Sequence, residues 1–208
     1  MLNQDPKYNR GIPDLTDMTQ EELLEYFKTL EAPTIEEMDG EYHTTKLGYH
    51  GIRDYLEWRL TCDNPLMNSE WLGKAFHPTG DGMGRGYNLF RKLGGKLTQV
   101  YPMRTVIGPS RYDGKPVYTL VYSAFPFTGT WLVQMVDELR KVGDNTYLLI
   151  GTYRGVFKGA KMRPHFWLVE GPYRAYRGDI GRETPKKVDL SKEIPNYKKL
   201  MKQAKKTK

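Results

Sequence analysis

The sequence predicts a mainly β protein that folds as an antiparallel barrel or sandwich. Beyond Gly40, short runs rich in Tyr, Val, Thr and Leu alternate with turns that contain Gly or Pro, which is typical of strands joined by tight connections. Residues 143–145, Gly-Asp-Asn, supply turn chemistry between two such runs, so antiparallel pairing follows. The expected strands are residues 40–47, 96–108, 115–125, 130–142, 145–157 and 164–173.

A short amphipathic helix is expected before the strands. Thr19 and Glu22 have the spacing of a capping box, and apolar residues then recur at helical intervals as far as Glu31. A second capping box, at residues 34–37, opens a further turn that Gly40 ends. Residues 52–60 fit either a helix or a strand, and we expect a strand there.

The charge distribution divides the chain into a neutral domain and a basic tail. The net charge is +7, and residues 182–208 carry ten Lys or Arg against three Asp or Glu, so the rest of the chain is balanced. We expect an irregular N-terminal arm at 1–18, a single barrel domain at 19–181 and a basic, flexible tail at 182–208. The tail could touch an anionic membrane surface weakly, whereas a nucleic-acid partner is not expected because the domain carries no excess positive charge.

Several classes of protein are excluded by composition and motifs. The single cysteine, Cys62, cannot form an internal disulfide, residues 1–15 lack the apolar core of a secretory signal, and no stretch is apolar enough to span a membrane, so we expect a cytoplasmic protein. The glycine-rich stretch 80–86 fits no phosphate-binding loop and is expected to be a mobile loop or an edge close to another backbone. Ser110 lacks the context of a nucleophile elbow, and the four histidines show no metal-ligand spacing, so no cofactor or metal is predicted.

Three segments, in this order, resemble a known family. They are IEEMDGEYHTT after the helix, a W-x-G-K-x-F pattern at 71–76, and a D-x-x-R-x-V pattern at 137–142 that is followed by a turn and an aromatic last strand. Together, over residues 19–172, they resemble the proteins named for a GXWXG motif, which a domain of unknown function usually follows. Tyr42 and Thr44 stand where that motif has Trp and Gly. The resemblance implies a lipocalin-like β-barrel with a helix near the N-terminus, and it implies no activity because none is established for the family.

The charged strand at 135–142 raises the main functional question. With a side-chain period of two, Asp137 lies on one face while Glu138 and Arg140 lie on the other, so a closed barrel would direct part of this charge inward. A buried carboxylate needs a partner across the lumen, or its pKa rises. The alternative is an ordinary solvated face, with Arg140 in a cross-strand ion pair.

Two functional hypotheses follow from an inward charge. In the first, the lumen binds a small hydrophobic or lipid-like molecule whose polar head is anchored by a charged side chain. In the second, the same cavity belongs to a cofactor-independent acid/base enzyme, an isomerase, cyclase or dehydratase acting on a hydrophobic carbonyl compound. The expected ligand-binding residues are Trp71, Lys74, Phe76, Tyr122, Arg140, Tyr153, Trp167 and, from a loop over the barrel mouth, Arg177. The candidate catalytic residues are Asp137, Glu138, His165 and Tyr112.

Overall fold

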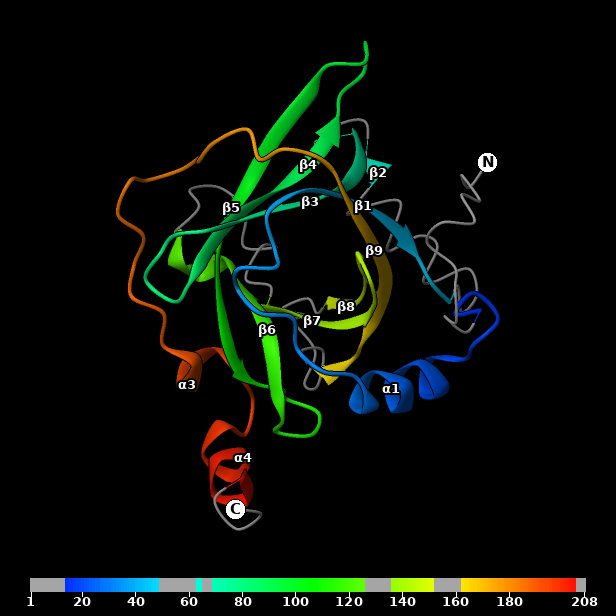
Figure 1. Cartoon of the computed structure of the whole chain (residues 1–208), viewed down its shortest axis with the longest axis vertical. Helices are drawn as coiled ribbons and strands as arrows, with labels where there is room; N and C mark the ends of the chain where they lie inside the picture. Colours follow the sequence, from blue (N-terminus) through cyan, green and yellow to red (C-terminus); the bar gives the residue numbers. More distant parts are fainter. Residues whose placement is uncertain (1–13, 49–62, 65–68, 126–135, 152–161, 205–208) are drawn as a thin grey trace.

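The computed structural model describes residues 14–48, 63–64, 69–125, 136–151 and 162–204 (Figure 1). Strands β1 and β3 to β9 follow one another as antiparallel neighbours, and the pairing of β1 with β3 closes them into a barrel. Strand β2 adds to an edge of β3. The predicted fold class is therefore confirmed, and the architecture fits a lipocalin-like barrel. The strands are β1 (Gly40–Lys46), β2 (Asp63–Asn64), β3 (Ser69–Pro78), β4 (Gly84–Arg91), β5 (Leu97–Pro109), β6 (Pro116–Val121), β7 (Val136–Gly143), β8 (Thr146–Gly151) and β9 (His165–Arg174).

The hairpin of β3 and β4 is absent from the strands expected from sequence, because glycines interrupt its pattern. Gly80 and Gly82 adopt positive φ in the turn, whereas Gly86 lies within β4. A Cβ on Gly86 would come 2.2 Å from the carbonyl oxygen of Ala75 on β3, so the two backbones approach too closely for a side chain there. The glycine-rich stretch is thus a turn at Gly80 and Gly82 and a close approach of two backbones at Gly86, so each of the two predicted alternatives describes part of it. The strand expected at 52–60 lies outside the described residues.

Helix α1 (Gln20–Thr29) covers part of the outer face of the barrel. Its predicted capping box is present, with the Glu22 amide donating to Thr19 Oγ1 at 3.2 Å and the Thr19 amide donating to Glu22 Oε2 at 2.8 Å. Leu23 and Phe27 are buried against outward-facing side chains of β6, β8 and β9. This outer apolar cluster consists of Leu15, Leu23, Phe27, Leu47, Val117, Leu148, Ile150 and Phe166. The strands beneath α1 are therefore apolar on both faces.

The segment between α1 and β1 runs across one end of the barrel (Figure 1). Its capping box forms a turn in which the Glu37 amide donates to Thr34 Oγ1 at 3.1 Å and the Thr34 amide donates to Glu37 Oε2 at 2.8 Å. Ile35 and Met38 are buried and belong to the inner core, so the segment closes that end of the lumen. Lys141 Nζ lies 2.6 Å from Glu37 Oε1 and ties the segment to β7.

An aromatic core fills much of the lumen. Phe76 packs edge-on against Tyr118, with ring centroids 5.6 Å apart, and lies tilted against Tyr42 at 5.5 Å. Burial raises the pKa of Tyr147 to about 12, so this inner phenol stays protonated at neutral pH. The inner core consists of Ile35, Met38, Tyr42, Phe76, Met103, Tyr118, Leu120, Tyr122, Leu139, Tyr147, Leu149, Trp167 and Val169. The aromatic residues that are abundant in the sequence thus gather inside the barrel.

The chain after β9 is held against the outside of the barrel. It passes over β4 and β5 and continues into α3 (Leu190–Glu193) and α4 (Tyr197–Ala204) (Figure 1). Arg85 on β4 donates hydrogen bonds to three carbonyl oxygens of this segment at 2.9–3.1 Å. Farther along the segment, Ile194 and Leu200 are buried. Residues 182–204 therefore contact the barrel through a few buried apolar side chains and backbone carbonyls, and the flexibility expected of the segment stays a prediction.

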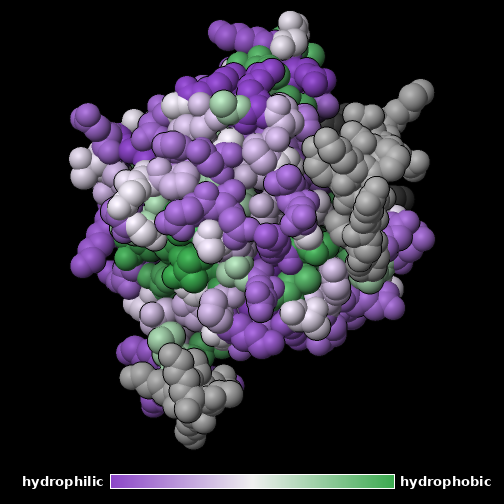
Figure 2. Space-filling view, viewed as in Figure 1, coloured by the Kyte–Doolittle hydropathy of each residue, from purple (hydrophilic) through white to green (hydrophobic). Residues whose placement is uncertain are grey.

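The outer surface is mainly hydrophilic on the face shown in Figure 2. Apolar side chains are gathered instead in the lumen and beneath α1. Within the part of the chain that the structure describes, no helix combines the length and apolar character needed to cross a bilayer.

Candidate functional site

Strand β7 directs its charged residues to both faces of the barrel wall, and both faces are buried. Asp137 points into the lumen, where it contacts Lys74 and Tyr122, whereas Glu138 and Arg140 point outward beneath neighbouring segments. The three β7 residues are between 0% and 2% exposed. The alternative of a solvated face is therefore wrong, because each charge has a partner inside the protein.

A buried polar cluster lies inside the barrel and consists of Lys74, Asn88, Tyr122 and Asp137, which we call the lumen cluster. The Lys74 ammonium donates to Asp137 Oδ2 at 2.9 Å, to the Tyr122 hydroxyl at 2.6 Å and to Asn88 Oδ1 at 2.9 Å. Tyr122 donates to Asp137 Oδ2 at 3.0 Å, and Asn88 Nδ2 donates to the Tyr122 hydroxyl at 3.2 Å. Strands on opposite sides of the lumen are thereby connected through charge-assisted hydrogen bonds.

A β-bulge in β3 brings the W-x-G-K-x-F residues to the lumen. Trp71 and Lys74 are three positions apart and would face opposite ways in a regular strand. The pairing of β3 with β4 shifts register between Trp71 and Gly73, and both side chains then reach Asn88, with Trp71 Nε1 donating to Asn88 Oδ1 at 3.1 Å. A Cβ on Gly73 would lie 1.9 Å from the carbonyl oxygen of Tyr42, so glycine is needed where β1 closes onto β3.

Aromatic rings surround the lumen cluster. Trp71 and Trp167 meet edge to face with centroids 5.6 Å apart, and Lys74 Nζ lies 5.1 Å from the centre of the Trp71 ring. Trp167 is 5% exposed, whereas Trp71 is only partly buried, so the cluster lies close to the rim of the barrel. Phe76 lies deeper, in the aromatic core. These residues give the lumen an apolar wall around a few fixed polar groups, which is the composition of small-molecule sites.

Two polar atoms beside the lumen cluster lack a hydrogen-bond partner within the described part of the chain. They are Asp137 Oδ1 and Trp167 Nε1. A buried polar atom without a partner costs about 1–3 kcal/mol, so each is a place where a ligand group would be stabilised. The first is a negatively charged acceptor and the second is a donor. A ligand donor would satisfy the first, and a ligand acceptor would satisfy the second.

Glu138 and Tyr112 lie outside the lumen. Glu138 accepts hydrogen bonds from Ser110 Oγ at 2.6 Å, from the Arg111 amide at 2.9 Å and from Arg111 Nε at 2.8 Å. Tyr112 packs against the outer apolar cluster, and burial raises the pKa of its phenol. The structure therefore does not bring either residue together with Asp137.

Arg140 connects β7 to two outer segments. Its guanidinium donates to both carboxylate oxygens of Asp113 at 2.9 Å and to the Phe27 carbonyl oxygen at 2.9 Å, and it lies 4.8 Å from the centre of the Phe27 ring. The same side chain is fully buried under α1. The D-x-x-R-x-V pattern thus places its carboxylate in the lumen and its arginine in the outer packing.

Of the remaining candidates, Arg177 lies outside the lumen, whereas His165 shares a face of β9 with Trp167. Arg177 forms an ion pair with Glu41 outside the lumen, and its amide donates to the Tyr87 hydroxyl at 3.1 Å. His165 is buried at the start of β9, with its ring 6.2 Å from that of Trp167. Tyr153 lies outside the described residues.

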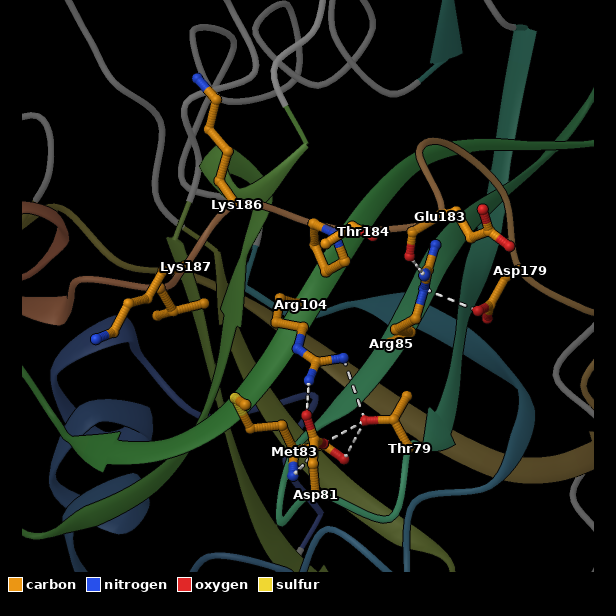
Figure 3. A pocket seen from close by; sticks show the side chains of 12 residues that line it. Thr79, Asp81, Met83, Arg85, Arg104, Asp179, Glu183, Thr184, Lys186 and Lys187 are labelled. Atoms are coloured by element: carbon orange, nitrogen blue, oxygen red, sulfur yellow. Dashed lines mark hydrogen bonds and ion pairs between the residues drawn. The ribbon is translucent and has the colours of Figure 1, made fainter.

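A surface cavity of about 520 Å³ lies between β4, β5 and the C-terminal segment (Figure 3). Arg104 pairs with Asp81, and Arg85 pairs with Asp179 at 2.9 Å, so both arginines of its wall already have carboxylate partners. The described residues contain no group of three His, Cys, Asp or Glu side chains that could hold a metal ion. The lumen cluster is therefore the stronger candidate site.

Asn88 is the site residue that the sequence analysis missed. It is a lone amide in the apolar run Tyr87–Phe90, and β4 itself was not expected. A single polar residue at an inward position of an apolar strand is a usable signal, but only after the strand has been recognised.

Comparisons with known proteins support the fold and leave the function open. No family model matches this chain, and no curated protein matches it. The crystal structure of a protein from Thermomonospora curvata is similar, with a TM-score of 0.50 and 16% sequence identity, over 74% of this chain and 87% of that one. At this identity the similarity concerns the barrel architecture alone, and the resemblance to the GXWXG-motif proteins stays a prediction.

Proposed function

We propose that this protein binds a small, mainly apolar molecule at the rim of the barrel lumen, with the lumen cluster beneath it. The observation that carries the proposal is the pair of buried polar atoms, Asp137 Oδ1 and Trp167 Nε1, that lack a partner among the described residues. Natural interiors rarely leave such atoms unsatisfied, and binding sites are a common exception. Barrels of about eight strands are wide enough for one small ligand.

The aromatic lining supports an apolar ligand. Trp71 and Trp167 offer indole faces near the rim, and Trp71 is only partly buried, so a ligand could cover its exposed part. Large aromatic side chains contribute much of the contact energy in such sites. The closed end beyond Phe76 and Tyr118 is filled by packed rings, which limits the ligand to the region around the lumen cluster.

The test is native mass spectrometry of protein purified without detergent, followed by solvent extraction of any molecule that it retains. We expect a bound molecule of defined mass, or a mass shift with members of a panel of lipids and polycyclic aromatics. Trp71→Ala should reduce retention, whereas Ile107→Ala, which alters an exposed residue of β5, should not. A clean apo mass with no shift across the panel would refute the proposal.

A second candidate, an acid/base enzyme in the same lumen, rests on the position of Tyr122. Its hydroxyl lies between an ammonium at 2.6 Å and a carboxylate at 3.0 Å, so a proton can pass along the chain from Lys74 through Tyr122 to Asp137, whose open Oδ1 could exchange it with a substrate. Asp137→Asn separates the two functions. A binding protein would change only in affinity, whereas an enzyme would lose about 10²–10⁴-fold in turnover of its substrate.

A further inference from the structure

The hydrogen bonds of the lumen cluster restrict what chemical group the ligand can present. Lys74 has three ammonium protons, and the structure gives each of them an acceptor, on Asp137, Tyr122 and Asn88. An anionic head group would have to displace one of these acceptors before it could pair with Lys74. The expected role of Lys74 as the direct anchor of a ligand is therefore disfavoured by its own contacts.

The Tyr122 hydroxyl likewise has a partner for each of its hydrogen-bonding positions. It accepts from Lys74 and from Asn88 Nδ2, and it donates its proton to Asp137 Oδ2. Since Asp137 Oδ2 already accepts two hydrogen bonds, the acceptor of this carboxylate that stays open within the described residues is Oδ1. Asp137 is 2% exposed, so bulk water does not supply a hydrogen bond to this atom.

The open acceptor and Trp167 lie close together beside Gly151. At the point where a Cβ of Gly151 would lie, Asp137 Oδ1 is 3.4 Å away and Trp167 Cζ3 is 2.6 Å away. The absence of a side chain at Gly151 lets the indole approach the wall of β8 and leaves Asp137 Oδ1 next to it. Cζ3 is on the benzene edge of the indole, so the unpartnered Trp167 Nε1 lies on the other side of the ring from Gly151, and the acceptor and the donor are separated by the indole.

The net charge of the lumen cluster then favours a neutral ligand over an anion. The lumen cluster contains one ammonium and one carboxylate at 2.9 Å, so the cluster itself has no net charge to offer an ion. A further ammonium, Lys46 Nζ, lies 5.6 Å from the centre of the Trp167 ring and is already engaged in contacts of its own. A second carboxylate would face Asp137 Oδ1 in a low-dielectric site, where like charges repel strongly. A hydroxyl or an amide N–H donates to that oxygen instead.

Resting on the proposed function, we infer that the ligand is a neutral apolar molecule with a hydroxyl or amide group, and that fatty-acid anions are discriminated against. The group donates to Asp137 Oδ1, the open acceptor of the lumen cluster. Hydrogen bonds to a charged partner are worth about 1.5–3 kcal/mol, which corresponds to about a tenfold to 100-fold preference over a ligand that cannot donate.

The experiment compares three ligands of one chain length, dodecanol, dodecanamide and dodecanoate, by tryptophan fluorescence titration at neutral pH with native mass spectrometry as a second readout. We expect the alcohol and the amide to bind at least tenfold more tightly than the carboxylate. Asp137→Asn should reduce this preference, because the amide removes the charge that repels the anion. The matched control is Glu138→Gln, the same chemical change on the next residue of β7, which faces outward and should leave the preference intact.

The outcomes separate the inference from the proposed function. If dodecanoate binds as tightly as the alcohol and the amide, or more tightly, the lumen binds ligands but the inference is wrong. If none of the three binds and no molecule is retained from the cell, the proposed function fails. The comparison of the three ligands on the unaltered protein decides the inference even if a variant does not fold.

Discussion

Arg140→Met is expected to lower the free energy of unfolding by about 3 kcal/mol, because it leaves the Asp113 carboxylate without its partner. Removing one member of a buried ion pair costs about 3–5 kcal/mol. The Arg140 side chain is 0% exposed and that of Asp113 is 13% exposed. Some solvent therefore reaches the unpaired Asp113 carboxylate, and we expect a cost at the lower end of the range for buried pairs. The Phe27 carbonyl oxygen also loses a donor at 2.9 Å.

The assay is equilibrium urea denaturation followed by tryptophan fluorescence. With a slope of about 2 kcal/mol per molar urea, the loss moves the midpoint down by about 1.5 M. Arg91→Met is the matched control, because its ion pair with Glu70 is 51% exposed on both sides and should contribute at most about 1 kcal/mol. A midpoint shift below about 0.5 M for Arg140→Met, together with loss of ligand binding, would show that Arg140 acts on the ligand and that its assignment to the outer packing is wrong.

Three further predictions concern barrel closure, the C-terminal segment and pH. Gly73→Ala should prevent regular pairing of β1 with β3, because its Cβ would lie 1.9 Å from the Tyr42 carbonyl oxygen, and native-state hydrogen exchange of β1 should rise; unchanged protection would contradict this. Leu200→Ala should cost about 2–3 kcal/mol in urea denaturation if α4 is anchored to the barrel, whereas a free helix would lose almost nothing. The hydrogen bond from Lys141 holds the pKa of Glu37 below its ordinary value near 4.5. This contact therefore stabilises the protein above that pH and is lost as the pH falls through the folded-state pKa, so Glu37→Gln should flatten the acidic side of the stability curve.

The sequence allowed most of the barrel to be predicted because strand patterns and capping boxes are local signals. Thr19 and Glu22 form the predicted cap, and the strand runs around Val117, Val136 and Trp167 lie in the barrel wall. Local signals failed at β4, where glycines that permit close backbone approach resemble those of a loop. In the C-terminal segment the lysines dominate the local pattern, so the burial of Ile194 and Leu200 was not expected from it.

The candidate site could be predicted only in part. Five of the predicted residues, Trp71, Lys74, Phe76, Tyr122 and Trp167, do point into the lumen, as does Asp137. Strand alternation correctly separates Asp137 from Glu138 and Arg140, but it cannot say which set is inside. That choice depends on which face α1 and the segment around Asp113 cover, and both are distant from β7 in sequence.

By itself, the sequence determined that this chain forms antiparallel strands, in a barrel or a sandwich, with a capped helix before them, because alternation, turn residues and capping depend on a few neighbouring positions. The tertiary structure alone decided that Lys74, Asn88, Tyr122 and Asp137 meet in one cluster, since they come from separate parts of the barrel and a bulge in β3 sets their register. It also decided which atoms stay open to a ligand. That follows from how many hydrogen bonds each group already makes, and no single stretch of sequence contains this information.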